Sequence, residues 1–152
     1  LDEADLPEGR LLYQKLCAAC HVLFGEGGNL GPDLTGAQRS SVEYLVENII
    51  APSASVARDY QMQVVELEDG RTVTGFFSAE TETTLTIRTL NEEIVTPKDR
   101  IAKQETLPVS IMPEGLFDQL TETEIRHLIG YLMNPRQVPL PEEATEESPI
   151  DE

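Results

Sequence analysis

The chain has 152 residues, of which 28 are acidic and 11 basic, and its formal net charge is −17. This charge argues against nucleic acid as a partner, because phosphate binding needs a positive surface, and it favours positively charged partners or simply solubility. No run of about 18 or more apolar residues occurs, so the sequence predicts no membrane span.

The length fits one modest domain, or one domain with an insertion. The first five residues, Leu1-Asp2-Glu3-Ala4-Asp5, are acidic and lack the basic start and apolar run of a secretory signal. We therefore expect a processed chain or an excised domain.

The first predicted helix, residues 7–20, leads into a cysteine motif. Its apolar face repeats at three- and four-residue spacing: Gly9, Leu12, Tyr13 and Leu16. The motif is Cys17-Ala18-Ala19-Cys20-His21, the spacing of c-type haem attachment. Two thiols two residues apart reach both vinyl groups of one porphyrin, and the histidine that follows can bind the iron.

Three other readings of this motif stay open. A thioredoxin-like redox pair would need a βαβ context and leaves the histidine without a role. A structural zinc site normally takes four Cys or His ligands, and beyond this motif the chain offers only the distant His127. The third is a simple disulfide or a chance occurrence of the motif.

A glycine-rich loop, residues 25–36, precedes the second predicted helix. Ser40-Ser41-Val42-Glu43 reads as a capping box that opens this helix, and Pro52 ends it. Its apolar face consists of Val42, Leu45, Val46, Ile49 and Ile50.

The pattern changes to strands near Tyr60. Residues 61–68 and 71–77 flank Asp69-Gly70, a strong hairpin signal. Residues 84–89 and 93–96 flank a turn at Asn91-Glu92, and residues 100–106 add a fifth candidate strand. We predict a small β-sheet or barrel of four or five strands.

A helical pattern returns after Pro113. A short apolar segment precedes a second capping box at Thr121–Glu124, and the helix that follows stops at Pro135. Its apolar face consists of Ile125, Leu128, Ile129 and Leu132. Residues 135–152 are rich in acids and proline, which predicts a disordered tail or a linker.

Together the two terminal helices resemble those of class I cytochromes c. Gly9 and Tyr13 stand eight and four residues before Cys17, and Leu128-Ile129-Gly130-Tyr131-Leu132 resembles the last helix of that fold. The resemblance implies a mainly α cytochrome c fold, three to five helices around one covalently attached haem c, with the β-sheet or barrel inserted. It also implies that the helices cross at small residues, with Gly9 as the first candidate and Gly130 as the second.

The same resemblance implies the site residues. Cys17, Cys20 and His21 hold the haem, the carbonyl of Pro32 in Gly31-Pro32 accepts a hydrogen bond from the histidine, and Met112 is the sixth ligand because Ile111-Met112-Pro113 precedes the last helices. The competing sixth ligands are Met62, Met133 and His127, and five-coordinate iron is the remaining alternative.

The order of elements resembles a bacterial group, the haem-binding domains of planctomycete and verrucomicrobial type at the C-terminal end of large dehydrogenases. On this basis residues 1–59 and 107–134 form the cytochrome c domain, 60–106 an inserted β-rich subdomain and 135–152 the tail.

The implied function is one-electron transfer from a fused or partner dehydrogenase to another redox carrier, outside the bacterial cytoplasm. The alternatives are a haem-based sensor with a displaceable sixth ligand and, among enzymes, a peroxidase, which usually needs two haems. We expect no enzymatic activity from this segment alone.

Overall fold

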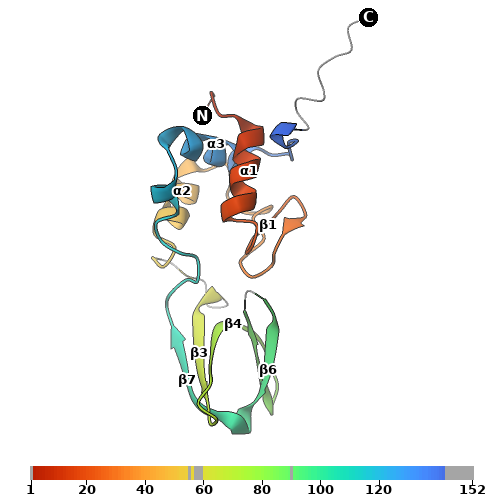
Figure 1. Cartoon of the computed structure of the whole chain (residues 1–152), viewed down its shortest axis with the longest axis vertical. Coiled ribbons are helices and arrows are strands. Elements are labelled where there is room, and N and C mark those ends of the chain that lie inside the picture. Colours follow the sequence, from red (N-terminus) through yellow and green to blue (C-terminus); the bar gives the residue numbers. More distant parts are fainter. Residues whose placement is uncertain (1, 55, 57–59, 90, 143–152) are drawn as a thin grey trace, which may run out of the picture. The chain divides into compact units, whose positions relative to one another are not determined.

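The computed structural model describes residues 2–54, 56, 60–89 and 91–142, and the chain forms two compact units (Figure 1). Unit 1 comprises Leu1–Ile50 and Gly115–Glu152, and unit 2 comprises Ala51–Glu114. Unit 2 is therefore one continuous stretch of chain, whereas unit 1 is assembled from the segments on either side of it. The prediction of a disordered tail falls, for residues 143–152, outside the described residues.

The first helix, α1 (Leu6–Leu16), begins where Asp5 caps it. The Asp5 side chain accepts a hydrogen bond from the Glu8 backbone N–H at 3.1 Å, and Pro7 lies in the first turn, where a missing N–H costs nothing. The buried face contains Gly9, Leu12 and Tyr13, as the spacing predicts. The helix ends at Leu16, earlier than predicted, and residues 17–20 form turns.

The last helix, α3 (Glu122–Met133), confirms the predicted capping box. The Thr121 hydroxyl accepts from the Glu124 N–H, and the Glu124 carboxylate accepts from the Thr121 N–H. Four apolar side chains of α3 are buried: Leu128, Ile129, Tyr131 and Leu132.

Helices α1 and α3 pack against each other at Gly9. A Cβ at this position would lie 2.1 Å from the His127 carbonyl oxygen and 2.6 Å from the Tyr131 Cβ, so only glycine allows this approach of the two backbones. Tyr13 packs on Tyr131 with ring centroids 5.7 Å apart. The ring Nδ1 of His127 accepts a hydrogen bond from the Asp5 N–H at 2.8 Å. The crossing predicted at Gly9 is therefore present, whereas Gly130 faces Ala4, ahead of α1.

The second helix, α2 (Val42–Ile50), buries Leu45 and Ile49. Its cap differs from the predicted one: the hydroxyl of Ser41, rather than that of Ser40, accepts from the Tyr44 N–H at 3.2 Å. The short apolar segment before α3 forms a 3₁₀ helix, η3 (Leu116–Gln119). Within the part of the chain that the structure describes, no helix has the length and apolar character needed to cross a membrane.

Unit 2 contains a five-stranded antiparallel sheet with the order β6-β5-β4-β3-β7. Its strands are β3 (Met62–Leu67), β4 (Thr72–Glu80), β5 (Thr84–Arg88), β6 (Glu93–Pro97) and β7 (Ile101–Leu107). The hairpin predicted at Asp69-Gly70 connects β3 to β4, and the Asp69 carboxylate accepts from the Arg71 N–H at 3.0 Å.

This sheet is strongly curled. Its two edge strands, β6 and β7, are joined through the three-residue η2 (Lys98–Arg100). In a flat sheet the edges would stand about 19 Å apart, four spacings of ~4.8 Å, whereas the link from Pro97 to Ile101 spans at most about 14 Å. Register shifts after Glu66 and Phe77 provide the bending. The curl encloses the core of the unit: Val65, Leu67, Val73, Leu85 and Ile87, with Ile94 and Ile101 packed against it.

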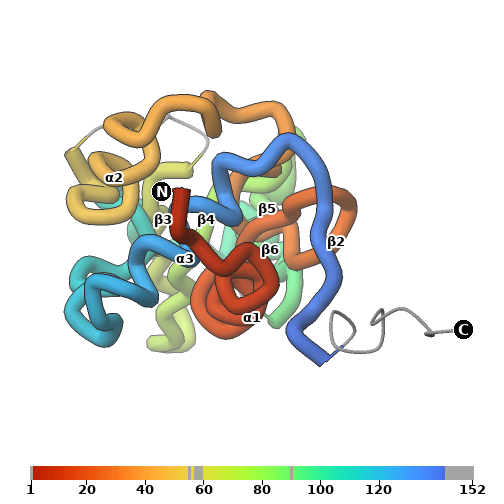
Figure 2. The backbone as a smooth tube through the Cα atoms, turned by 90° about the horizontal axis from the view of Figure 1, so that it is seen from above, coloured from red at the N-terminus to blue at the C-terminus, as the bar shows by residue number. Residues whose placement is uncertain are grey.

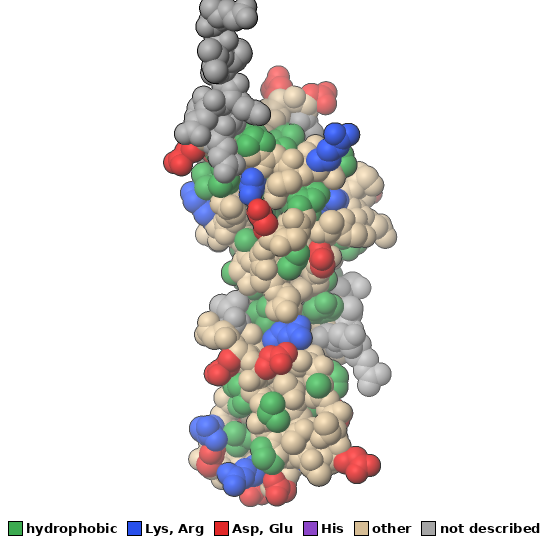
Figure 3. Space-filling view, turned by 90° about the vertical axis from the view of Figure 1, so that its right-hand side faces the viewer, with side chains coloured by type: hydrophobic (Ala, Val, Ile, Leu, Met, Phe, Trp, Pro, Cys, Tyr) green, Lys and Arg blue, Asp and Glu red, His purple; other side chains and the backbone are tan. Residues whose placement is uncertain are grey.

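Charged side chains of both signs cover the surface of unit 2. Arg88 pairs with Glu93 at 3.2 Å and Lys98 with Glu80 at 2.6 Å, and Figure 3 shows acidic and basic groups side by side on the face that it presents. Exposed pairs of this kind contribute about 0–1 kcal/mol each. Stability of the unit therefore comes mainly from the enclosed core.

The predicted fold class, a mainly α cytochrome c fold with an inserted sheet or barrel, is wrong. Within the described residues, three α-helices stand beside seven strands in two sheets, and about 26% of these residues are in strands. Part of the difference arises directly after the cysteine motif, where β1 (Val22–Leu23) and β2 (Glu26–Gly27) form a small antiparallel hairpin. The larger part is the five-stranded unit, whose share of the chain makes the fold a mixed α and β one.

Replacement of Gly9 by alanine should destabilise the protein by about 3 kcal/mol, because the added methyl group meets backbone that cannot move aside cheaply. The free energy of unfolding, measured by urea denaturation, tests this. Gly36→Ala is the matched control, since nothing lies within 4 Å of its Cβ position. Equal stability of the two variants would contradict a close crossing at Gly9.

Candidate functional site

The cysteine motif forms a tight turn directly after α1. The Cys17 N–H donates to the Tyr13 carbonyl at 2.8 Å, and the N–H groups of Cys20 and His21 donate to the Cys17 carbonyl at 3.1 and 2.9 Å. The last turn of α1 thus continues into the motif and holds its three functional side chains on one short stretch of backbone.

Both cysteines are free thiols and partly buried. Burial, together with the neighbouring Cys20, raises the pKa of Cys17 to about 12, and burial also raises the pKa of Cys20. A dithiol redox pair needs a lowered thiol pKa. These shifts run against the thioredoxin-like reading of the motif.

The His21 ring is oriented by the loop after the motif. Its Nδ1 lies 2.8 Å from the carbonyl oxygen of Pro32, an acceptor, so Nδ1 is the protonated nitrogen. Gly31 allows this, because a Cβ there would lie 2.8 Å from the His21 Cε1. Among the described residues Nε2 has no hydrogen-bond partner, so its lone pair is available for a metal ion. The hydrogen bond expected here is present, and the role of Pro32 toward a haem stays a prediction.

A buried tyrosine connects α1 to the histidine. The Tyr13 hydroxyl donates to the His21 carbonyl at 2.7 Å and lies 3.5 Å from the Glu26 carbonyl. Burial raises the pKa of Tyr13, which therefore stays a neutral donor. The backbone on both sides of the β1–β2 hairpin is thus held by one side chain of α1.

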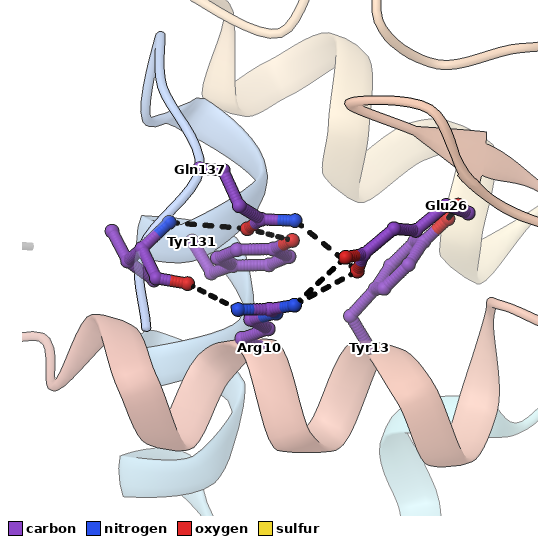
Figure 4. A network of polar contacts seen from close by, with 6 residues as sticks. Arg10, Tyr13, Glu26, Tyr131 and Gln137 are labelled. Carbon is purple, nitrogen blue, oxygen red and sulfur yellow. Dashed lines mark hydrogen bonds and ion pairs between the residues drawn. The ribbon is translucent and has the colours of Figure 1, made fainter. Parts of the chain in front are cut away.

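A polar network next to Tyr13 joins the hairpin to the chain after α3 (Figure 4). Arg10 donates to both carboxylate oxygens of Glu26, at 3.0 and 2.9 Å, and to the Val138 carbonyl at 2.6 Å. Gln137 accepts from the Tyr131 hydroxyl at 2.8 Å and lies 3.4 Å from Glu26. Figure 2 shows the chain after α3 passing β2, where this network forms.

Sequence reasoning missed this network. No local pattern marks Arg10, Glu26 or Gln137, because the contacts join residues 111 and 128 positions apart. The Phe24-Gly25 turn between β1 and β2 gave no signal in the sequence, since phenylalanine is not a typical residue of such turns.

The predicted sixth ligand and its competitors lie in different places. Met112 belongs to unit 2, where its N–H donates to the Ser110 hydroxyl at 3.1 Å. Met62 also belongs to unit 2 and pairs with Phe76 and Leu107 in the sheet. Met133 is the last residue of α3, and His127 uses its Nδ1 at the helix crossing. The structure thus brings Cys17, Cys20, His21 and Pro32 together in unit 1, and Met112 as a ligand stays a prediction.

The groups in unit 1 fit a c-type haem. Two free thiols are separated by two residues, the sequence spacing of c-type haem attachment. The histidine that follows has its Nδ1 hydrogen-bonded to Pro32 and its Nε2 available for the iron. A haem bound there would supply an iron centre that changes its charge by one electron. Cys17 and Cys20 would hold it covalently, and His21 would ligate the iron.

Tyr13→Phe should lower the free energy of unfolding by about 1 kcal/mol, because the His21 carbonyl loses its hydroxyl donor. Chemical denaturation measures this loss. Tyr44→Phe is the control, because Tyr44 is exposed and no partner of its hydroxyl appears among the described residues. A loss equal in both variants would mean that the Tyr13 hydroxyl does not hold the motif.

Comparison with protein families adds to this geometry. Residues 4–62 match the family described as cytochrome C oxidase, cbb3-type, subunit III. No curated protein matches the chain. The matched stretch contains α1, the cysteine motif and α2. It supports a cytochrome c domain, an electron-transfer module that works with redox partners and is generally not catalytic on its own. The match implies covalently attached haem c and indicates haem-based electron transfer.

Proposed function

We propose that this chain is a mono-haem c-type cytochrome that takes up one electron from a dehydrogenase and passes it to another redox carrier. The observation that carries the proposal is the His21 ring, which is fixed at Nδ1 by the Pro32 carbonyl directly after two free thiols. This arrangement leaves Nε2 for the iron and makes the imidazole a stronger donor.

Each site residue has a distinct role in this proposal. Cys17 and Cys20 form thioether bonds to the porphyrin, His21 is the proximal ligand and Pro32 orients it. Met112 provides the sixth ligand through its thioether sulfur. A His and Met ligand pair raises the reduction potential relative to two histidines, and it leaves no position for a substrate at the iron.

The electron donor in this proposal is a dehydrogenase, fused to the chain or docked on it, as in the planctomycete and verrucomicrobial proteins that the chain resembles. The location is outside the bacterial cytoplasm, where cytochrome c domains of this type are typically found. The net charge of −17 suits a donor or acceptor with a positively charged docking surface.

Met112→Ala should abolish the weak sulfur-to-iron charge-transfer band of the oxidised protein and lower its reduction potential. The protein is to be produced with a c-type haem maturation system and measured by absorption spectroscopy and redox titration. Met62→Ala is the matched control, since its side chain lies on β3 within the same unit. A band that survives in Met112→Ala and disappears in Met62→Ala would contradict the assignment.

The native protein should titrate as a single one-electron couple and should not bind carbon monoxide rapidly in its reduced form. One haem and a filled sixth position are the physical reasons. Fast carbon monoxide binding would instead favour the alternative function, a haem-based sensor with a displaceable ligand. Failure of the haem to attach would contradict both.

A further inference from the structure

Phe24 is held in a strained backbone conformation. Its φ is 52°, in the left-handed region, and it is the one residue other than glycine with positive φ in the described part of the chain. With Gly25 (φ 81°) it forms the two-residue turn between β1 and β2, where Leu23 pairs with Glu26. Asparagine and glycine are the usual residues of such turns. A large aromatic residue held in this conformation points to a role beyond the turn itself.

The Phe24 ring is fixed by two side chains from other parts of unit 1. It packs edge-on against Tyr131 of α3, with ring centroids 6.3 Å apart. The guanidinium carbon of Arg39 lies 4.9 Å from the ring centroid, within the range of a cation–π contact. Phe24, Arg39 and Tyr131 form what we call the Phe24 cluster.

Arg39 ties the Phe24 cluster to the end of α3. Its Nη1 donates to the carbonyls of Leu132 and Asn134, at 2.9 and 2.7 Å, and its Nη2 donates to the Thr35 carbonyl at 3.2 Å. A cation is favoured at these last carbonyls of a helix. The guanidinium therefore has a defined position over the Phe24 ring.

The Phe24 cluster lies at one end of a ladder that contains the histidine. Residues 20–24 and 31–35 run side by side, linked by the N–H of Gly31 to the Cys20 carbonyl (2.6 Å) and the N–H of Leu34 to the Val22 carbonyl (2.8 Å). The last rung is the Phe24 N–H, which donates to the Thr35 hydroxyl at 2.9 Å. The hydrogen bond between His21 and Pro32 lies between these rungs.

We propose that Phe24 is a positioning residue for His21: its ring, held by Tyr131 and Arg39, fixes the two segments of the ladder and thereby the hydrogen bond from His21 Nδ1 to the Pro32 carbonyl. This inference rests on the proposed function, because that hydrogen bond controls how strongly the imidazole donates to the iron. Loosening the ladder weakens the donation and raises the reduction potential.

The test uses the haem-loaded protein and the substitution Phe24→Asn. Asparagine tolerates positive φ, so the turn is kept while the ring is removed. We expect exchange of the His21 Nδ1–H with solvent, followed by NMR, to become about tenfold faster, as for the loss of one ordinary hydrogen bond. The reduction potential should shift to a more positive value. Phe24→Tyr keeps the ring and should leave both the exchange rate and the reduction potential at their native values.

Leu12→Val is the control for stability alone, because Leu12 is buried in α1 and takes no part in the hydrogen bonds of the ladder. It should lower stability and leave the His21 exchange and the potential unchanged. If Phe24→Asn lowers stability in the same way and changes neither quantity, the inference is overturned and Phe24 is a packing residue.

Failure of the variant to load haem and failure of the proposed function can each be told apart from failure of the inference. If Phe24→Asn does not load haem, Phe24→Leu replaces it, since leucine keeps apolar bulk and offers Arg39 no ring face; faster exchange supports the inference and unchanged exchange overturns it. If the native protein carries no haem or shows no one-electron couple, the proposed function fails, and the inference fails with it. The native spectrum alone distinguishes that outcome from a failure of the inference.

Discussion

The close contact of α1 and α3 at Gly9 is the constraint on which the rest of unit 1 depends. With no side chain at this position, the α1 backbone reaches the His127 carbonyl and the Tyr131 Cβ. That approach brings Tyr13 and Tyr131 into ring contact and leaves the Tyr13 hydroxyl directed at the His21 carbonyl. The position of the proposed iron ligand is thus set by the packing of two helices, one of which lies far along the chain.

The motif itself is held from two sides. Tyr13 and Arg10 of α1 hold the hairpin after His21, through the His21 carbonyl and the Glu26 carboxylate. The loop after the hairpin holds the ring, through the Pro32 carbonyl. A neutral hydrogen bond of this kind contributes about 0.5–1.5 kcal/mol, and the Arg10–Glu26 pair, whose carboxylate is exposed, about 0–1 kcal/mol. A preorganised imidazole of this sort suits electron transfer, where the ligands should not move when the iron changes charge.

Local patterns in the sequence were sufficient for the motif, the helix faces and the sheet. The Cys-x-x-Cys-His spacing, the Thr121–Glu124 box and the Asp69-Gly70 turn each encode their structure within a few residues. The predicted fold class was wrong because the resemblance to cytochromes was given more weight than the strands, which make up about 26% of the described residues. The contacts of Arg10 and Arg39 were not predictable, because their partners lie far away in the sequence and only tertiary packing brings them near. The turn at Phe24 was not predictable either, because phenylalanine is not a typical turn residue.

In the sequence, unit 2 is inserted between the two segments of unit 1, and this order affects how the chain folds. Ala51–Glu114 is contiguous and pairs neighbouring strands through short turns, apart from the β3–β7 pair, so it can form before α3 is synthesised. Gly9 and His127, in contrast, meet across most of the chain. The long insert costs little stability, because the entropic cost of closing a loop grows only with the logarithm of its length. Contacts between residues so distant in sequence nevertheless slow folding. Docking of α3 on α1 is therefore expected to be a late step of folding, because it must wait until the whole chain has been synthesised.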